Sequence, residues 1–195
     1  KKINEYDKCP KCHNTYLIKQ SNYSFHIFED VLVLLDRLED KWVITISTQY
    51  GCSSNCTFCD VPKVGPGINA TFDDMLGQIE YALSLHPEVK FTKRLNLHYA
   101  RMGEPTFNLD ILPLTRQLAF VLARYTFHPV ISTMLPNRNK HLLYFLKEWM
   151  DIKNKDLNGE AGLQFSINST NDLQRDEMFS NNSLKLLEIS ALARN

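Results

Sequence analysis

The sequence predicts an α/β fold, a truncated and therefore partial (β/α) barrel with a short N-terminal extension. From Lys41 onward, short β-branched or alternating runs take turns with runs of helical spacing, which is typical of βαβ units and a parallel sheet. Several such units follow one another, and right-handed crossovers add parallel neighbours until the sheet closes or stops. An open, doubly wound sheet is the alternative.

Each element has its own local signal. The run WVITIS (42–47) is rich in β-branched residues, and residues 95–100 alternate with period two until a Gly and a Pro break the pattern. Thr71 and Asp110 are expected to cap helices, because their side chains accept hydrogen bonds from the free N–H groups of a first turn. The expected strands are 42–47, 95–100, 129–133 and 162–168, and the expected helices are 71–86, 110–125, 140–149 and 182–193. The loops after the strands should meet at one edge of the sheet.

Residues 1–40 lack the alternation of strand and helix patterns seen in residues 41–195, so we expect an N-terminal extension (1–40) followed by the core (41–195). A hairpin of residues 22–28 and 31–36 is expected beside the first core strand, after a Cys-x2-Cys turn. The chain starts without Met and stops inside a run of helical spacing, which favours a piece of a longer protein.

Composition narrows the class of protein. The 195 residues include 22 Lys and Arg against 22 Asp and Glu, which argues against a broad nucleic-acid-binding surface and leaves room for a local basic patch. Apolar runs such as 31–35 are far too short to span a membrane, and no signal-peptide pattern is visible. We therefore expect a cytoplasmic protein with no membrane partner.

The 5 Cys fall into two groups, which does not resemble a secreted disulfide framework. Cys52, Cys56 and Cys59 lie within one short loop directly after the first core strand. Three thiolates on one loop suit three irons of a four-iron cluster, with the fourth iron left open for a ligand. A zinc site completed by a distant His, or three unrelated thiols, are the alternatives.

The sequence resembles the radical S-adenosylmethionine (SAM) superfamily at this loop, with Cys-x3-Cys-x2-Cys and an aromatic residue before the last Cys. Three runs sharpen the resemblance to the radical SAM RNA methyltransferases that methylate adenosine in ribosomal and transfer RNA. They are STQYGCSSNCTFC (47–59), MGEPTFN (102–108) and NDLQRD (171–176).

The resemblance implies a 4Fe-4S cluster held by Cys52, Cys56 and Cys59, with SAM chelated at the fourth iron. One electron, from a donor such as flavodoxin or ferredoxin, would cleave SAM to a 5'-deoxyadenosyl radical, and RNA would be the substrate. The protein would orient SAM and shield the radical.

The resemblance also implies which residues bind SAM. Gly103 and Glu104 would hold the methionyl amine, which agrees with what a Gly and a carboxylate at a strand end can do by themselves: allow close approach and accept from an ammonium group. The other implied SAM-binding residues are Phe58 near the adenine, Ser132 at the ribose or carboxylate, and Ser166, Ile167 and Asn168 along the nucleoside. Without the resemblance, Ser132 and Ser166 could simply bind local backbone, and Glu104 could be a solvated loop carboxylate.

Two departures from the family bear on the reaction. Thr45 stands where the methyltransferases carry a catalytic Cys. Their second catalytic Cys lies beyond the point at which this sequence ends, and no Cys follows Cys59 in the sequence shown. Asn168 stands where the family usually has His. The sequence therefore assigns no catalytic residue and predicts SAM cleavage more firmly than methyl transfer. A radical SAM enzyme for a peptide or small molecule, or a non-catalytic metal-binding or RNA-binding module, are the alternatives.

Cys9 and Cys12 form half of a zinc ribbon and are candidate zinc ligands, with His13 or His26 as candidate partners. An exposed thiol pair or a redox dithiol are the alternatives. His98, on the second core strand, is expected to fill the polar interior of the barrel rather than to bind a metal.

Overall fold

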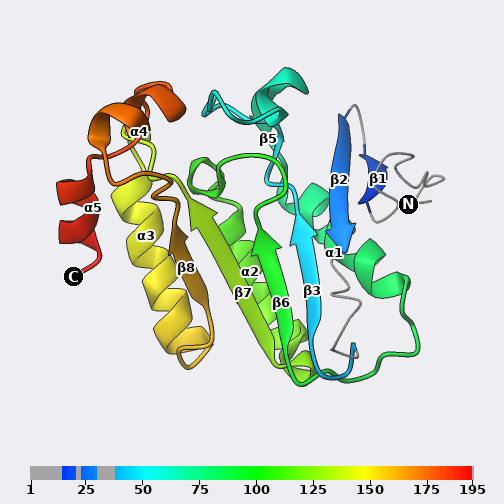
Figure 1. The fold of residues 1–195 in the computed structure, drawn as a ribbon. Helices are drawn as coiled ribbons and strands as arrows, with labels where there is room; N and C mark the ends of the chain where they lie inside the picture. The colour runs from blue at the N-terminus through cyan, green and yellow to red at the C-terminus, as the bar shows by residue number, and fades with distance from the viewer. Residues whose placement is uncertain (1–14, 21–22, 30–37, 195) are drawn as a thin grey trace.

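The fold is described from a computed structural model, which describes residues 15–20, 23–29 and 38–194. Its main feature is a 6-stranded sheet in the order β1-β2-β3-β6-β7-β8. The strands are β1 (Thr15–Gln20), β2 (Tyr23–Glu29), β3 (Trp42–Ile46), β6 (Leu95–Tyr99), β7 (Phe127–Thr133) and β8 (Gly162–Phe165). From β3 to β8 all neighbours are parallel, whereas β1 and β2 form an antiparallel hairpin beside β3 (Figure 1).

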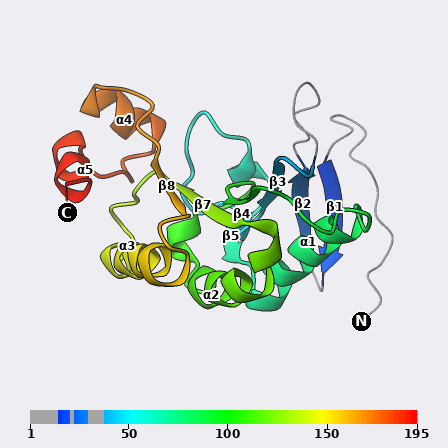
Figure 2. The same ribbon diagram turned by 90° about the horizontal axis from the view of Figure 1, so that it is seen from below.

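The parallel strands follow one another in space in the order of the chain, without the reversal that defines a doubly wound sheet. Figure 2 shows α1 (Phe72–Ser84), α2 (Ile111–Val121) and α3 (Leu142–Asp151) on the same face of the sheet. Helices on one face and strands in chain order are the arrangement of a (β/α) barrel that has not closed. The predicted partial barrel is confirmed.

The core lies between the sheet and these helices. Trp42, Ile44 and Ile46 of β3 are fully buried, and they alternate with the half-buried Val43 and Thr45 on the other face. Leu95, Leu97 and Tyr99 repeat this pattern on β6. His98 is half-buried on the face turned away from the helices, where burial lowers its pKa and the nearby His128 lowers it further.

Of the two helix caps predicted from the sequence, Thr71 is confirmed and Asp110 is not. Thr71 caps α1 as predicted, because its Oγ1 accepts from the Asp74 N–H at 3.1 Å while Asp74 accepts from the Thr71 N–H at 3.0 Å. The prediction for Asp110 is wrong: its side chain makes no capping bond. Asn108 instead accepts a hydrogen bond from the Asp110 N–H at 3.1 Å.

Several predicted bounds also shift. The hairpin pairs residues 15–20 with 23–29, so the predicted first strand, 22–28, is the second strand of the hairpin and its partner precedes it. Residues 31–36 lie outside the described part of the chain. The fourth predicted core strand ends at Phe165 instead of Asn168. The second predicted helix ends at Val121, and a 3-10 turn, Ala123–Tyr125, follows it.

Smaller elements gather at the carboxyl edge of the sheet. They are β4 (Gln49–Gly51) and β5 (Pro66–Asn69), paired as a separate 2-stranded sheet, together with α4 (Asp172–Met178) and α5 (Leu186–Leu192). Figure 1 shows that the arrows of the parallel strands point toward the edge where β5 and α4 lie. Within the described residues, no helix has the length and apolar character needed to cross a membrane.

Candidate active site

A pocket of about 200 Å³ lies at the carboxyl ends of the parallel strands, between the loops that follow β3, β6, β7 and β8. It contains all of the predicted cofactor-binding residues within the described chain except Ile167. Its lining residues are Cys52, Ser54, Cys56, Phe58, Cys59, Val61, Ala100, Arg101, Gly103, Glu104, Ser132, Met134, Ser166, Asn168 and Phe179. Residues that lie more than a hundred positions apart in the sequence therefore meet in one place.

The cysteine loop is held at its base by the ribbon of β4 and β5. Gly51 ends β4 with φ +73°, and a Cβ placed there would lie 1.9 Å from the carbonyl oxygen of Gly65. Only glycine fits so close a contact between two backbones. The two ends of the loop are thus fixed near each other, and the three cysteines project from one short closed segment.

The three thiols of this loop are free and half-buried. Burial raises the pKa of Cys52, and burial together with the negative charges of Cys52, Cys59 and Glu104 raises the pKa of Cys56 to about 12. Thiolates crowded in this way are stabilised by a cationic metal centre, which lowers their pKa. The pocket therefore suits a ligand that brings positive charge to the thiols.

Among the residues described, no three Cys, His, Asp or Glu side chains converge closely enough to hold one metal ion. A four-iron cluster makes a different demand, since each of its thiolate ligands binds a different iron. Three free thiols on one loop at the rim of one pocket are the donor set that such a cluster requires. The residues present fit a 4Fe-4S cluster by the chemistry of these donors.

Glu104 is almost completely buried and is not the solvated loop carboxylate that the sequence left open. Its Oε1 accepts from the Thr106 N–H and hydroxyl at 3.2 and 2.8 Å and from the Thr133 hydroxyl at 2.6 Å. Its Oε2 accepts from the Met134 N–H at 3.1 Å. Burial raises the pKa of Glu104 even though these donors lower it. The carboxylate thus joins the end of β7 to the loop after β6, and Oε2 keeps room for a further donor.

Gly103 has φ +97°, and a Cβ there would lie 2.6 Å from the Cβ and Cγ of Gln49. The sequence predicted that this glycine lets the backbone approach a ligand. In the structure the close approach that requires glycine is made to Gln49, inside the protein.

Gln49 is a site residue that the sequence analysis missed. Its Oε1 accepts from the Glu104 N–H at 3.1 Å, and its Nε2 donates to Asn69 Oδ1 at 2.8 Å and to the Gly67 carbonyl at 3.1 Å. The cysteine loop and the glutamate loop are therefore held by one buried amide. Its place beside the cysteines was the only signal available in the sequence.

The serines and Asn168 line the side of the pocket formed by β7 and β8. The Ser132 hydroxyl donates to Gln164 Oε1 on the neighbouring strand at 2.7 Å, which leaves its own lone pairs free. The Ser166 N–H donates to the Thr133 carbonyl at 2.8 Å, and Asn168 has a left-handed φ of 58°. Asn tolerates this conformation better than most residues, and here it turns the chain at the pocket.

Arg175 is a second residue that the sequence analysis missed, although it lies within one of the quoted runs. Arg175 is 1% exposed, and its guanidinium donates to the carbonyls of Ser166, at 3.1 Å, and Ile167, and also to the Ser183 hydroxyl. It therefore fixes the backbone of the strand end that lines the pocket. Forked donors of this kind are specific to arginine.

The end of α4 contacts the cysteine loop directly. The Thr57 N–H donates to the Met178 carbonyl at 2.9 Å, and the Ser180 hydroxyl donates to the Asn55 carbonyl at 2.6 Å. The exposed Phe58 ring meets Phe179 edge to face, with centroids 5.6 Å apart. The cysteine loop is thus held from both sides of the pocket.

Other predicted residues lie elsewhere. Ile167 packs against a separate apolar cluster that includes Leu135 and Ile189, and is not among the lining residues. Thr45 lies on β3, paired in register with His98 of β6, and does not line the pocket either. Cys9 and Cys12 lie outside the described residues.

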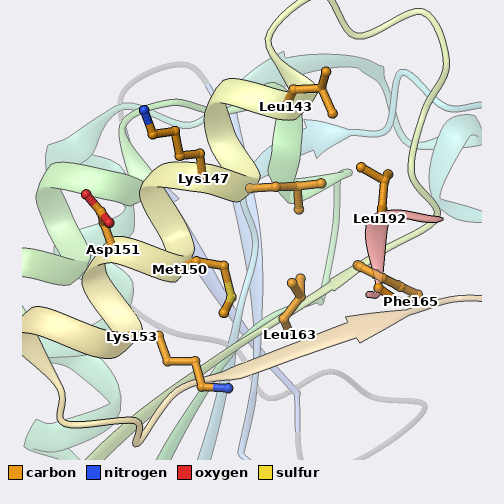
Figure 3. A pocket seen from close by; sticks show the side chains of 10 residues that line it. Leu143, Lys147, Met150, Asp151, Lys153, Leu163, Phe165 and Leu192 are labelled. Atoms are coloured by element: carbon orange, nitrogen blue, oxygen red, sulfur yellow. The ribbon is translucent and has the colours of Figure 1, made fainter. Parts of the chain in front are cut away.

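A larger cavity of about 650 Å³ lies between α3, β8 and α5. Figure 3 shows Leu143, Met150, Leu163, Phe165 and Leu192 around a common space, with the ends of Lys147 and Asp151 directed away from it. Its lining is mainly apolar and includes no Cys or His. We assign the site to the smaller pocket, because it contains the three thiols and the Glu104 carboxylate, whereas the larger cavity contains no thiol.

Comparison with known proteins agrees with the motifs. No family model matches the chain. Segments of the chain are similar to curated bacterial proteins of one class, RNA methyltransferases. The chain thus resembles the radical SAM RNA methyltransferases, as its quoted runs indicate.

The particular relatives are dual-specificity RNA methyltransferases named RlmN. That of Campylobacter lari is 36% identical over 69 residues, which are 35% of this chain and 19% of the relative. That of Desulfosudis oleivorans is 40% identical over 73 residues, 37% of this chain and 19% of the relative. The match thus spans about a fifth of each relative. A solved radical SAM methyltransferase from Sphaerobacter thermophilus aligns with 84% of this chain and 57% of its own, with a TM-score of 0.44 and 15% identity.

Proposed function

We propose that this chain carries the cofactor-binding core of a radical SAM enzyme that cleaves SAM reductively and acts on RNA. The observation that carries the proposal is the gathering of the three loop cysteines, Glu104 and the polar ends of β7 and β8 around one pocket. These residues come from separate loops, and only the fold brings them together.

Cys52, Cys56 and Cys59 would hold the 4Fe-4S cluster. The chemistry supplied by the bound cluster is a one-electron reduction of SAM, which breaks the bond between its sulfur and its 5' carbon. The electron would come from an external donor such as flavodoxin or ferredoxin. Zinc at Cys9 and Cys12, which lie outside the described residues, would take no part in this reduction.

The residues of the pocket would orient SAM. Oε2 of Glu104, which accepts from the Met134 N–H, would accept a further bond from the methionyl ammonium group. Ser132, Ser166 and Asn168 would contact the ribose and the nucleoside, and Phe58 would pack against the adenine. A substrate held in this way places the reacting bond at one fixed position, which is how such proteins contribute to the rate.

RNA is proposed as the substrate because the relatives are named RNA methyltransferases. Thr45 limits the proposal, since a hydroxyl does not provide the thiol chemistry that the resemblance places at this position. We therefore propose SAM cleavage and an RNA substrate, and we do not propose methyl transfer through a pair of cysteines. A peptide or small-molecule substrate is the second candidate, and the difference at Thr45 is the observation that favours it.

The test is product formation by anaerobically reconstituted protein incubated with SAM and dithionite. We expect 5'-deoxyadenosine and methionine from the wild type, and neither from Cys56→Ala. Arg138→Gln, a change at an exposed residue that does not line the pocket, is the control and should keep full activity. Cluster-loaded wild type that never cleaves SAM would overturn the proposal. Cross-linking or filter binding with adenosine-containing RNA then separates an RNA substrate from a peptide.

A further inference from the structure

Arg101 lines the pocket but takes no part in the contacts described so far. It lies in the loop after β6, and its backbone N–H donates to the Ile46 carbonyl at 3.0 Å. Among the described residues around the pocket it is the only basic one. The pocket therefore contains one fixed cation beside three thiols and a carboxylate.

The Nε atom of Arg101 is buried and has no hydrogen-bond partner in the part of the chain that the structure describes. Buried donors are nearly always paired in native proteins, because an unpaired one loses its contact with water and gains nothing in return. A guanidinium edge made of Nε–H and Nη–H matches the two oxygens of a carboxylate. Arg101 lines the pocket, and its unpaired Nε leaves the guanidinium able to bind a carboxylate there.

The charges of the pocket favour one class of ligand group. Arg101 and Glu104 lie three positions apart in one loop, and both line the pocket. A cation and an anion on one loop match the α-carboxylate and the α-ammonium that an amino acid carries on a single carbon. A phosphate group brings negative charge without an accompanying ammonium group to a pocket that already contains Glu104 and the thiols, where like charges repel.

We propose that Arg101 binds the α-carboxylate of the amino-acid part of the ligand, while Glu104 accepts from its α-ammonium group. This inference rests on the proposed function, in which the ligand is SAM. It adds Arg101 as the group that distinguishes a ligand with an amino-acid tail from a plain nucleoside.

The experiment compares two ligands that share the nucleoside. SAM has the amino-acid tail, and 5'-methylthioadenosine lacks it. Their dissociation constants are measured by anaerobic titration calorimetry on cluster-loaded wild type, Arg101→Gln and Arg101→Lys, with iron content checked for each protein. Arg138→Gln removes the same charge from an exposed position and is the matched control.

We expect Arg101→Gln to weaken SAM binding by roughly tenfold to a hundredfold, since a charge-assisted pair is lost. The affinity of Arg101→Lys for SAM should lie between those of the wild type and Arg101→Gln, because lysine keeps the positive charge but lacks the two parallel N–H donors of arginine. Affinity for 5'-methylthioadenosine should stay unchanged in both variants.

Two results would overturn the role of Arg101 without touching the proposed function. One is a SAM affinity that Arg101→Gln leaves unchanged. The other is an equal loss of affinity for SAM and for 5'-methylthioadenosine, which would mean that Arg101 only supports the shape of the pocket. Reduced RNA binding with unchanged SAM binding would assign Arg101 to an RNA phosphate instead. Wild type that binds no SAM at all would overturn the proposed function first, and the assignment with it.

Discussion

The Oε1 atom of Gln49 accepts a hydrogen bond from the backbone N–H of Glu104 at 3.1 Å. Gln49 begins β4, just before the cysteines, and Glu104 lies in the loop after β6. The nitrogen of the same amide donates to β5. Because an amide has one accepting and one donating end, it can join these segments in only one orientation. The Gln49 side chain therefore helps to fix the relative position of the cysteines and Glu104, together with the bonds from the N–H groups of Thr48 and Gln49 to the Met102 carbonyl.

Gln49→Ala should disturb both loops at once. The substitution leaves the Glu104 N–H and the Gly67 carbonyl without their partner, so we expect unfolding to become easier by about 1 to 3 kcal/mol. Urea unfolding gives this value, and iron retention on dilution reports the cysteine loop. Gln117→Ala, on the exposed side of α2, should change neither. Normal stability and iron retention in Gln49→Ala would contradict the role of this amide.

Glu104→Ala should be a folding variant as much as a binding variant. Its removal leaves buried donors of Thr106, Thr133 and Met134 unpaired, which should lower the free energy of unfolding by on the order of 3 kcal/mol. Glu104→Gln keeps the shape and one accepting oxygen and should lose less. Chemical denaturation of both variants, followed by SAM titration of the folded protein, separates the two effects. A stable Glu104→Ala would mean that the hydrogen bonds contribute little.

Arg175→Lys should loosen the end of β8. A lysine keeps the charge but cannot donate to the carbonyls of Ser166 and Ile167 and to Ser183 together, so we expect a loss of about 2 to 4 kcal/mol. Thermal or urea unfolding measures it. Arg116→Lys, which affects an exposed ion pair with Glu148, is the control and should cost less than about 1 kcal/mol. Equal losses in the two variants would count against a special role for Arg175.

Stability should depend on pH through His98. Burial lowers its pKa in the folded protein, so the unfolded chain binds the proton more readily. This contribution to stability is present above the ordinary histidine pKa of about 6.5 and is lost as pH falls from there toward the folded value. His98→Gln should flatten this part of the curve in urea titrations between pH 5 and 8. His141→Gln, at the exposed start of α3, serves for comparison. A curve unchanged by His98→Gln would remove this residue from the explanation.

Zinc and iron should separate between the two groups of cysteines. Cys9→Ser/Cys12→Ser should lose bound zinc and retain iron, because a pair of thiols suits a closed tetrahedral site and the triplet suits a cluster. Elemental analysis of wild type and variant decides the matter. Unchanged zinc would exclude the Cys9 and Cys12 pair as its ligands, and lost iron would mean that the cluster had been misassigned.

Sequence periodicity was enough to predict the core strands, because burial on one face imposes alternation on β3 and β6. It did not predict which hydrogen bonds end each element. Asp110 has the right residue type for a cap, yet the N–H groups of Ile111 and Leu112 in the first turn donate to the backbone carbonyls of Asn108 and Leu109. The partner of the second hairpin strand was also missed, since several polar and apolar runs near the N-terminus alternate equally well.

The site was predictable where a motif named its residues and not where distant segments meet. Glu104 was found from its loop, but its burial depends on Thr133, which is 29 positions away. Gln49 and Arg175 act through backbone groups of other segments, and such contacts leave no periodic pattern in a sequence. Arg101 was also missed, although it directly precedes the quoted run 102–108.

The position of β8 at the edge of the sheet affects how the protein must be handled. In the described part of the chain, no strand pairs with the side of β8 that faces away from β7, and the apolar cavity of Figure 3 adjoins it. An unpaired edge beside apolar side chains is a template for adding another copy of the chain. Concentrated samples should therefore self-associate, and a lysine in place of Leu143, which is 65% exposed, should suppress this without touching the pocket.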